Sequence, residues 1–394
     1  MALPIVDLSP LLAVRAGGKN DKHSSGSGDN NRTAAAVSCC QCCVQSIGKA
    51  CREEGFFYII GHGIDPALPA QLQRSAAEFF ALPRAIKRRS EMAKGGKAWR
   101  GYFEVGEELT SGLVDEKEGL YFGEELDESE SRPLHGPNLW PAPLDVGEEL
   151  AASLRAATLS WIDAMTELGM VILEAIASSL GLEPGHFGPQ FRAPTKLFRI
   201  FNYPPHDSRH YADSFAVGEH TDYGYLTLLW QDDNGGLQVQ GSSGEWIEAP
   251  PVHGSFIINL GDALEHNTGG LLRATAHRVA PRAGALAGRL SFPFFLDPSF
   301  DAVLTSVVDK LPIKLQEEAA RRRASRPERW DGENVQSFGG KTCESQQSID
   351  RRLRARWHSR CWSSLADHGL WAWADGEHLV SRVSRVFPHL LGKL

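Results

Sequence analysis

Six short runs of β-forming residues follow one another in the second half of the chain, separated by glycine, proline, asparagine and aspartate. The runs cover residues 197–203, 225–231, 236–240, 255–259, 275–281 and 289–296. Short strands at such near-regular spacing are typical of a β-sandwich or a β-barrel. This half of the chain is therefore predicted to form an all-β core.

The first half of the chain is predicted to be mainly helical. Residues 34–53 and 68–80 favour helices. The clearest helix covers residues 146–181, where apolar side chains recur every three or four positions until Gly181 ends the pattern. Helices first and strands second predict one α+β unit, with the helices packed outside the β-core.

We expect three regions along the chain. Residues 1–190 form an N-terminal helical region, residues 191–312 the β-core, and residues 313–394 a C-terminal helical tail. The Gly/Ser/Asn/Lys-rich stretch of residues 13–33 has few apolar side chains and predicts a flexible insertion. Residues 343–378 mix tryptophan, cysteine and arginine without a period, and they predict a second insertion.

Charge and cysteine content restrict the cellular setting. The net charge of −8 disfavours nucleic acid and anionic membrane as partners. No run of about 18 apolar residues is present, and the first residues lack the basic and apolar segments of a secretory signal. Seven cysteines, an odd number, indicate reduced thiols, and the cluster at residues 39–43 lacks the second pair that a zinc site needs. We expect a cytoplasmic protein, monomeric and without a nucleic-acid or membrane partner.

His220 and Asp222 lie two residues apart, just before a β-forming run. Side chains at positions i and i+2 of an extended chain point to the same face, so both can reach one metal while Thr221 points away. Two histidines and one carboxylate on one face of an octahedron bind non-haem Fe(II) and leave three positions open. A His-x-Asp pair alone is also common in surface turns, so the interpretation requires a third ligand from another segment.

His277 is the candidate third ligand. It lies in another β-forming run, 55 residues after Asp222. His253 and His266 are alternatives, but each stands beside glycine or asparagine in a predicted turn, where a rigid ligand position is not expected. The competing interpretation of His277 is a buried structural histidine.

Arg289 and Ser291 repeat the i, i+2 pattern in a third run, twelve residues after His277. A guanidinium fork and a hydroxyl that face the same way suit a carboxylate. The three runs together predict a metal site with an anchor for an organic acid.

The ordered set of His220-Thr221-Asp222, His277 and Arg289-Leu290-Ser291 resembles the 2-oxoglutarate- and Fe(II)-dependent oxygenases, in particular the isopenicillin N synthase-like branch, the iron/ascorbate oxidoreductase family. The resemblance covers residues 3–300 through further matches in the family's order. These matches are Pro4-Ile5-Val6-Asp7-Leu8, Glu54-Gly55-Phe56-Phe57, Asn202-Tyr203-Pro204-Pro205, Gly235-Gly236-Leu237-Gln238-Val239 and Asn259-Leu260-Gly261-Asp262.

The resemblance implies a double-stranded β-helix, or jelly-roll, core with flanking N-terminal helices and the metal at one open end. His220, Asp222 and His277 would hold Fe(II), with no catalytic residue beyond this metal centre. One departure concerns the family's Asn-x-Tyr-Pro pattern, because Phe201 stands where many members have the asparagine. We assign no role to the neighbouring Asn202.

The resemblance also implies a co-substrate and a reaction. 2-Oxoglutarate would bind the metal and place its distal carboxylate on Arg289 and Ser291, with Tyr203 as a further contact. O2 would then oxidise a small organic substrate, usually by hydroxylation, while 2-oxoglutarate becomes succinate and CO2. Ascorbate would be a supporting reductant.

Two other functions remain open at this point. An Fe(II)-dependent oxidase of the same branch would keep the metal but not use 2-oxoglutarate. A jelly-roll binding protein without catalysis would retain the ligands as a structural site. The aromatic residues Tyr102, Phe103, Tyr121 and Phe122 either line the substrate pocket or pack as ordinary core residues.

Overall fold

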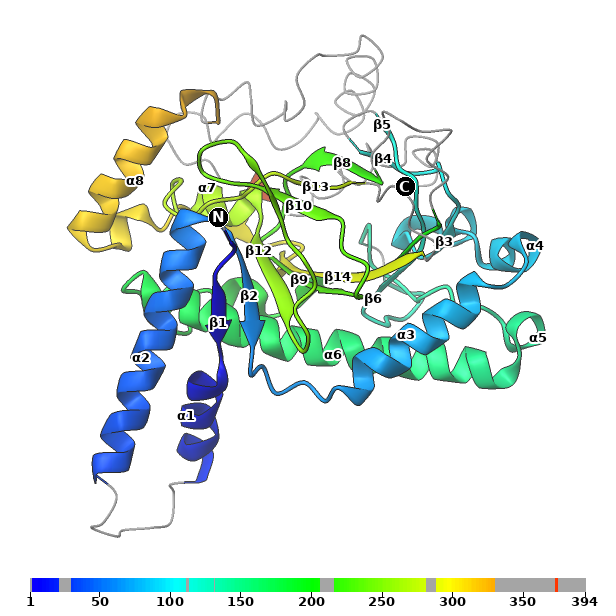
Figure 1. The fold of residues 1–394 in the computed structure, drawn as a ribbon, viewed down its shortest axis with the longest axis horizontal. Coiled ribbons are helices and arrows are strands. Elements are labelled where there is room, and N and C mark those ends of the chain that lie inside the picture. Colours follow the sequence, from blue (N-terminus) through cyan, green and yellow to red (C-terminus); the bar gives the residue numbers. More distant parts are fainter. Residues whose placement is uncertain are drawn as a thin grey trace.

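The computed structural model of the 394-residue chain describes residues 2–20, 30–110, 113–130, 132–205, 216–280, 288–329 and 373–374 (Figure 1). Within these residues, two β-sheets face each other and helices cover the outside of the larger one. The α+β architecture and the jelly-roll core are thus confirmed.

The major sheet has eight strands and the minor sheet four. In spatial order the major sheet consists of β1 (Ile5–Asp7), β2 (Phe56–Ile60), β12 (Phe256–Leu260), β9 (Leu226–Gln231), β14 (Arg289–Ser299), β7 (Pro194–Tyr203), β6 (Glu118–Gly123) and β3 (Gly101–Phe103). The minor sheet consists of β11 (Trp246–Glu248), β10 (Leu237–Gln240), β13 (His277–Val279) and β8 (Val217–His220). All pairs are antiparallel except β1 with β2. Two further antiparallel pairs of short strands are β4 (Leu109–Thr110) with β5 (Leu113–Val114), and β15 (Val303–Leu304) with β16 (Trp373–Ala374).

Alternation along β7 shows how the two faces of the major sheet are used. Phe198 and Ile200 belong to the core under the helices, whereas Phe201 and Tyr203 belong to a second apolar cluster that also contains Val217 of β8. Successive side chains of a strand point to opposite faces. Odd-numbered residues of β7 therefore point into the barrel, towards the minor sheet.

The α-helices of the described residues are α1 (Ser9–Asn20), α2 (Asn30–Glu53), α3 (Ala67–Phe80), α4 (Arg84–Lys87), α5 (Pro143–Val146), α6 (Glu148–Ser179), α7 (Asp262–Asn267) and α8 (Ile313–Ser325). Single 3-10 turns cover Arg88–Ser90, Met92–Lys94, Gly96–Ala98, Gly188–Phe191, Val308–Lys310 and Pro327–Arg329. The helices predicted at residues 68–80 and 146–181 are confirmed as α3 and α6.

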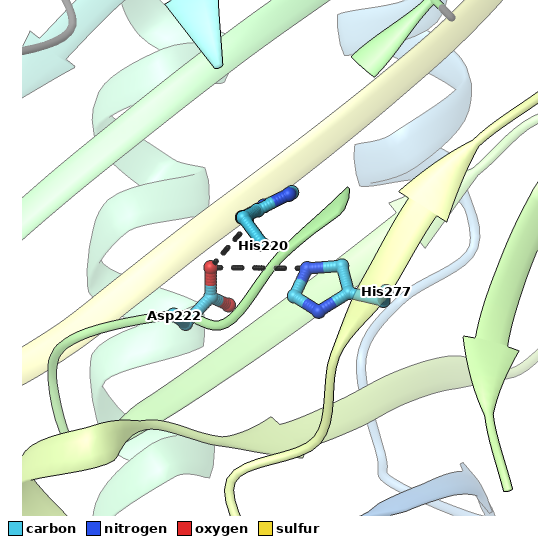
Figure 2. A group of neighbouring side chains, drawn as sticks. All are labelled: His220, Asp222 and His277. Carbon is cyan, nitrogen blue, oxygen red and sulfur yellow. Dashed lines mark ion pairs between the residues drawn. The ribbon is translucent and has the colours of Figure 1, made fainter. Parts of the chain in front are cut away.

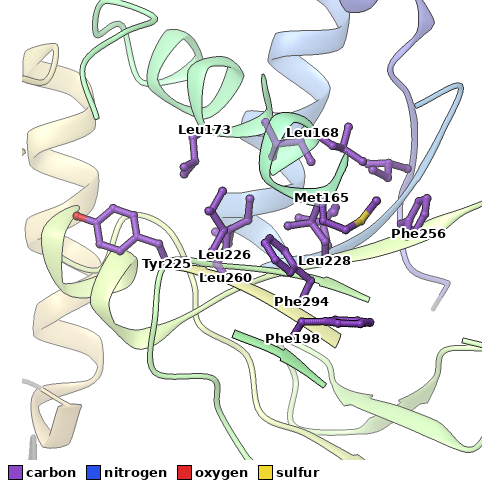
Figure 3. Close-up of a cluster of buried hydrophobic side chains, with 14 of the residues drawn as sticks. Met165, Leu168, Leu173, Phe198, Tyr225, Leu226, Leu228, Phe256, Leu260 and Phe294 are labelled. Atoms are coloured by element: carbon purple, nitrogen blue, oxygen red, sulfur yellow. The ribbon is translucent and has the colours of Figure 1, made fainter. Parts of the chain in front are cut away.

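Helix α6 lies along the outer face of the major sheet, with α2 and α3 packed against it (Figures 1 and 3). Gly169 allows a close approach to β14, because a Cβ there would stand 2.5 Å from Leu296 Cδ2. Among the described residues, α6 alone is long and apolar enough to cross a membrane by length and composition. Its apolar side chains are instead buried in the protein core, where Met165 and Leu168 face Leu228 and Phe294 (Figure 3).

Trp161 of α6 is fully buried against three phenylalanine rings of the sheet, at centroid distances of 5.7–6.0 Å. Replacing Trp161 by alanine should lower the free energy of unfolding by about 3–5 kcal/mol, because it removes a large apolar side chain and leaves a cavity. Leu144→Ala is the matched control, since Leu144 is 98% exposed and should change stability by less than about 0.5 kcal/mol. Denaturant unfolding of both variants measures the difference, and equal losses would contradict the packing described here.

The stretch predicted as a flexible insertion is helical at both ends. Residues 13–20 belong to α1 and residues 30–33 to α2, while residues 21–29 lie outside the described part of the chain. Leu11 packs against the core and Arg15 forms an ion pair with Glu174 of α6, so tertiary contacts favour a helix despite the weak local pattern. Most of residues 343–378 and the helical spacing near the C-terminus also lie outside the described residues.

Candidate metal centre and co-substrate site

Two strands of the minor sheet bring the candidate histidines together. In the antiparallel pair of β8 and β13, His220 stands directly opposite His277. Asp222 follows two residues after the end of β8, where the chain turns towards the major sheet. The three side chains therefore converge at one end of the barrel (Figure 2).

The distances suit one small cation. One ligand atom from each residue lies within 4.8 Å of the others. Asp222 Oδ1 is 3.8 Å from Nε2 of His220 and 3.8 Å from Nε2 of His277 (Figure 2). Two imidazoles and one carboxylate in a single cluster are the donor set that non-haem Fe(II) uses, and they fit that metal here.

The other nitrogen of each imidazole is occupied by a backbone carbonyl. His220 Nδ1 lies 2.9 Å from the carbonyl oxygen of Gly218, and His277 Nδ1 lies 3.1 Å from that of Thr275. A carbonyl only accepts, so each Nδ1 carries the proton and each Nε2 presents its lone pair to the metal position.

The second oxygen of Asp222 is held by the major sheet. Asp222 Oδ2 accepts hydrogen bonds from Thr227 Oγ1 of β9, at 2.5 Å, and from Asn259 Nδ2 of β12, at 2.7 Å. These bonds leave Oδ1 free to bind a metal through one oxygen. The loop itself is fixed by the amide of Asp262, which donates to the carbonyl oxygen of Asp222 at 2.7 Å.

Burial sets the protonation states that a metal requires. Desolvation lowers the pKa of His277 to about 4 and also lowers the pKa of His220. Desolvation alone would raise the pKa of Asp222, but the neighbouring histidines and the bonds from Thr227 and Asn259 lower it overall. At neutral pH the imidazoles are therefore neutral and the carboxylate is ionised.

Asn259→Leu should weaken Fe(II) binding by about 10–100-fold without removing a ligand, because Asp222 loses one of the two donors that orient it. Thr227→Val removes the other donor and should act in the same direction. Metal affinity, measured by titration of the apoprotein under argon, checks both variants. Wild-type affinity in the Asn259→Leu/Thr227→Val double variant would show that these bonds do not orient the ligand.

The alternative histidines do not join this group. His253 is exposed in the turn before β12, and His266 lies in α7. Of the described residues, His220, Asp222 and His277 are the only set of three that could hold a metal.

Arg289, Ser291 and Tyr203 lie close together on the neighbouring strands β14 and β7. Arg289 stands opposite Tyr203 in the pair of β14 and β7, and its guanidinium carbon lies 4.8 Å from the centre of the tyrosine ring. All three side chains are buried. Arg289 Nη2 donates to Gln231 Oε1 of β9 at 3.1 Å.

The remaining nitrogens of Arg289 lack partners. Nε and Nη1 are buried and have no hydrogen-bond partner among the described residues. A buried guanidinium with unpaired donors is costly, and a carboxylate bound there would satisfy them. The chemistry of this site therefore fits the distal carboxylate of 2-oxoglutarate.

The aromatic block at residues 101–123 is divided between the two faces of the sheet. Phe103 and Tyr121 point into the barrel, in contact with Phe201, whereas Tyr102 and Phe122 belong to the core under the helices. All four side chains are buried. Ordinary core packing therefore accounts for Tyr102 and Phe122, while a role of Phe103 and Tyr121 in lining the substrate pocket stays a prediction.

Several residues around the site were not identified from the sequence. Thr227, Asn259 and Gln231 support the predicted residues, and Arg199 and Glu108 are buried in the same barrel. Asn259 belongs to the Asn-Leu-Gly-Asp match to the family, and this match could have identified it as a residue near the site. The others carry no local pattern, because their roles depend on contacts between distant strands.

Two family models match the chain. Residues 3–143 match the N-terminal domain described as non-haem dioxygenase in morphine synthesis, and residues 194–298 match the 2OG-Fe(II) oxygenase superfamily. The first match covers α1 to α4 with strands β1 to β6, and the second covers the strands from β7 to β14 except the last residue of β14, while α6 and α8 lie outside both.

Individual proteins extend this similarity. A probable iron/ascorbate oxidoreductase of Dictyostelium discoideum is 43% identical over 75% of this chain and 84% of its own. A 1-aminocyclopropane-1-carboxylate oxidase of Dictyostelium mucoroides is 34% identical over 86% of this chain and 91% of its own. A full-length Neurospora crassa protein, whose crystal structure was solved in complex with alpha-KG, shares the fold, with a TM-score of 0.65 at 22% identity over 97% of this chain and 96% of its own.

Proposed function

Because the chain belongs to the 2OG-Fe(II) oxygenase superfamily, a family of oxidoreductases that use Fe(II) and 2-oxoglutarate, we propose that it oxidises a small organic substrate with O2 while converting 2-oxoglutarate to succinate and CO2. Hydroxylation is the proposed outcome for the substrate. The proposal includes ascorbate as a supporting reductant.

The proposal assigns the metal to three residues and the co-substrate to three others. His220, Asp222 and His277 hold Fe(II), and the carbonyls of Gly218 and Thr275 keep both imidazoles in the tautomer that binds it. Bound Fe(II) would supply the activation of O2, which protein side chains cannot perform.

The co-substrate site performs binding and orientation. Arg289 pairs with the distal carboxylate of 2-oxoglutarate, and Ser291 and Tyr203 complete that end of the site. The burial of these side chains excludes water from the carboxylate and strengthens the ion pair. The observation that carries the dependence on 2-oxoglutarate is the buried guanidinium of Arg289, two of whose nitrogens have no hydrogen-bond partner in the part of the chain that the structure describes.

A second candidate is an oxidase of the same superfamily that does not use 2-oxoglutarate. The similarity to 1-aminocyclopropane-1-carboxylate oxidases favours it. In that case Arg289 and Ser291 would hold another carboxylate or bicarbonate. An intact ligand set with an intact anchor disfavours the third possibility, a binding protein without catalysis.

An anaerobic titration separates these functions. Addition of 2-oxoglutarate to the Fe(II)-loaded protein should produce the weak visible charge-transfer band of the chelate, and admission of O2 should then release succinate. Succinate in place of 2-oxoglutarate is the control, because it lacks the 2-oxo group that chelates. A spectrum that 2-oxoglutarate leaves unchanged would eliminate the leading proposal and favour the oxidase.

The proposal also keeps the three-part division of the chain at residues 1–190, 191–312 and 313–394. It further includes a cytoplasmic monomer without nucleic-acid or membrane partners, consistent with a net charge of −8. Size-exclusion chromatography and localisation of a tagged chain test the monomer and the compartment.

A further inference from the structure

Arg199 is a second buried guanidinium inside the barrel, distinct from Arg289. It lies on β7, four residues before Tyr203, and points to the same interior face. Four residues of a strand span roughly 13 Å, so the backbone of Arg199 lies that far along β7 from Tyr203, the residue opposite Arg289. Arg199 is 9% exposed.

Aromatic rings cover both faces of the Arg199 guanidinium. Its central carbon lies 4.4 Å from the centre of the Tyr121 ring and 4.7 Å from that of Phe295. Stacking of this kind holds the guanidinium plane in place and leaves its edge for hydrogen bonds. The NH groups along the edge of the guanidinium are therefore the part of Arg199 that can bind a hydrogen-bond acceptor.

The described residues offer few hydrogen-bond acceptors to the NH groups along that edge. Nη2 donates one long bond of 3.3 Å to the hydroxyl of Tyr223. Nη1 is 3.7 Å from Glu108 Oε1, which is within ion-pair range but beyond a hydrogen bond, and Nε has no partner among the described residues. A buried cation whose donors are this poorly satisfied can bind a further anionic group.

Glu108 cannot be that anion alone, because its carboxylate is already engaged. Tyr121 donates to Glu108 Oε1 at 2.7 Å, and Lys117 Nζ lies 2.9 Å from Glu108 Oε2. Lys117 also pairs with the buried Asp115. Glu108, Asp115 and Lys117 together carry one net negative charge. This charge attracts the Arg199 guanidinium, but it does not provide acceptors for all of its NH groups.

Arg199 is linked through Tyr223 to the chain segment that carries two of the candidate metal ligands. Its hydrogen-bond partner Tyr223 directly follows the candidate ligand Asp222. Since the Tyr223 hydroxyl accepts from Arg199, its own proton can be donated to a ligand. A carboxylate on this edge would thus receive bonds from both Arg199 and Tyr223, the residue next in the chain to a candidate metal ligand.

We propose that Arg199 and Tyr223 bind a carboxylate of the primary substrate, and that this protein therefore acts on small organic acids. The inference rests on the proposed function, in which Arg289 is taken by 2-oxoglutarate. The aromatic walls formed by Phe103, Tyr121 and Phe295 favour an acid with an apolar body.

Phenylacetate and phenylacetamide form a matched pair of probes, since they differ in charge but hardly in shape. Each is titrated into the anaerobic Fe(II)–2-oxoglutarate complex at saturating 2-oxoglutarate, and the shift of the charge-transfer band reports binding. The acid should bind the wild-type protein about tenfold more tightly than the amide, as expected for charge-assisted bonds. Arg199→Gln should remove this preference, and Tyr223→Phe should reduce it.

Arg278→Gln is the matched control, because Arg278 stacks on Trp246 at 3.9 Å on the minor sheet and has no part in the proposed site. The preference for the acid should survive in this variant. Formation of the 2-oxoglutarate band shows that a variant is folded, and Tyr223→Phe provides the test if Arg199→Gln does not fold.

Three outcomes would overturn the inference. Equal affinity of acid and amide for the wild-type protein would do so, as would an undiminished preference in Arg199→Gln or, where that variant does not fold, in Tyr223→Phe. Weaker 2-oxoglutarate binding in Arg199→Gln with unchanged phenylacetate affinity would assign Arg199 to the co-substrate instead. Failure of the proposed function is distinguishable, because the wild-type band would then not form with 2-oxoglutarate at all.

Discussion

Asp222→Ala should abolish detectable succinate formation and weaken Fe(II) binding by well over a hundredfold. Loss of a residue that merely orients a ligand costs about 10–100-fold in affinity, and this variant removes the ligand itself. It also removes the only negative charge among the three ligands, so two neutral imidazoles remain to bind a dication. Metal titration of the apoprotein and succinate release measure the two effects.

His277→Ala should have a comparable effect, because the metal would keep only two ligands, His220 and Asp222, which lie two residues apart in the chain. His253→Ala is the matched control, since it removes an exposed histidine and should leave metal affinity unchanged. Tight Fe(II) binding in both ligand variants would mean that the metal lies elsewhere. Loss in His253→Ala alone would restore one of the alternatives that the sequence left open.

Arg289→Met should raise the KM for 2-oxoglutarate by a factor of roughly thirty or more, with little change in metal affinity. Removal of one member of a buried, hydrogen-bonded charge pair typically costs about 2–5 kcal/mol of binding free energy. Arg289→Lys keeps the charge but loses the planar fork, so it should fall between the wild type and Arg289→Met. Steady-state kinetics at varied 2-oxoglutarate measure all three proteins.

The free energy of unfolding distinguishes a role of Arg289 in binding 2-oxoglutarate from a role in holding the fold together. Without co-substrate, Arg289 is a buried cation, and two of its nitrogens find no partner among the residues that the structure describes. Arg289→Met should therefore leave the free energy of unfolding unchanged or raise it. Arg278→Met is the control for loss of a stacked arginine outside the proposed site. A strongly destabilised Arg289→Met protein with an unchanged KM would contradict the assignment.

The order of the elements could be predicted from the sequence because their patterns are local. β7, β9, β10, β12, β13 and β14 each carry their own β-forming run, and α6 carries its own apolar stripe, whereas β8 and β11 of the minor sheet are too short to show such a run and were not predicted. Helix α1 was not predicted, because tertiary contacts, such as Arg15 with Glu174, favour it more than its composition does.

The candidate site could also be predicted from the sequence only in part. His220, Asp222 and His277 were identifiable because i, i+2 spacing and chain order are visible in one dimension. The bonds from Thr227 and Asn259 to Asp222 were not, since they depend on the register of β9 with β12. Arg199 was also missed, because its open edge is visible only when Tyr121, Phe295 and Glu108 are placed around it.

The metal position joins the two sheets of the barrel. Both histidines belong to the minor sheet, whereas Asp222 is held by Thr227 and Asn259 of the major sheet. A ligand that binds only the folded state stabilises it in proportion to the logarithm of its concentration over Kd. A cell short of iron would therefore hold a less stable form that opens and is degraded more readily, so the abundance of this protein should follow the iron supply.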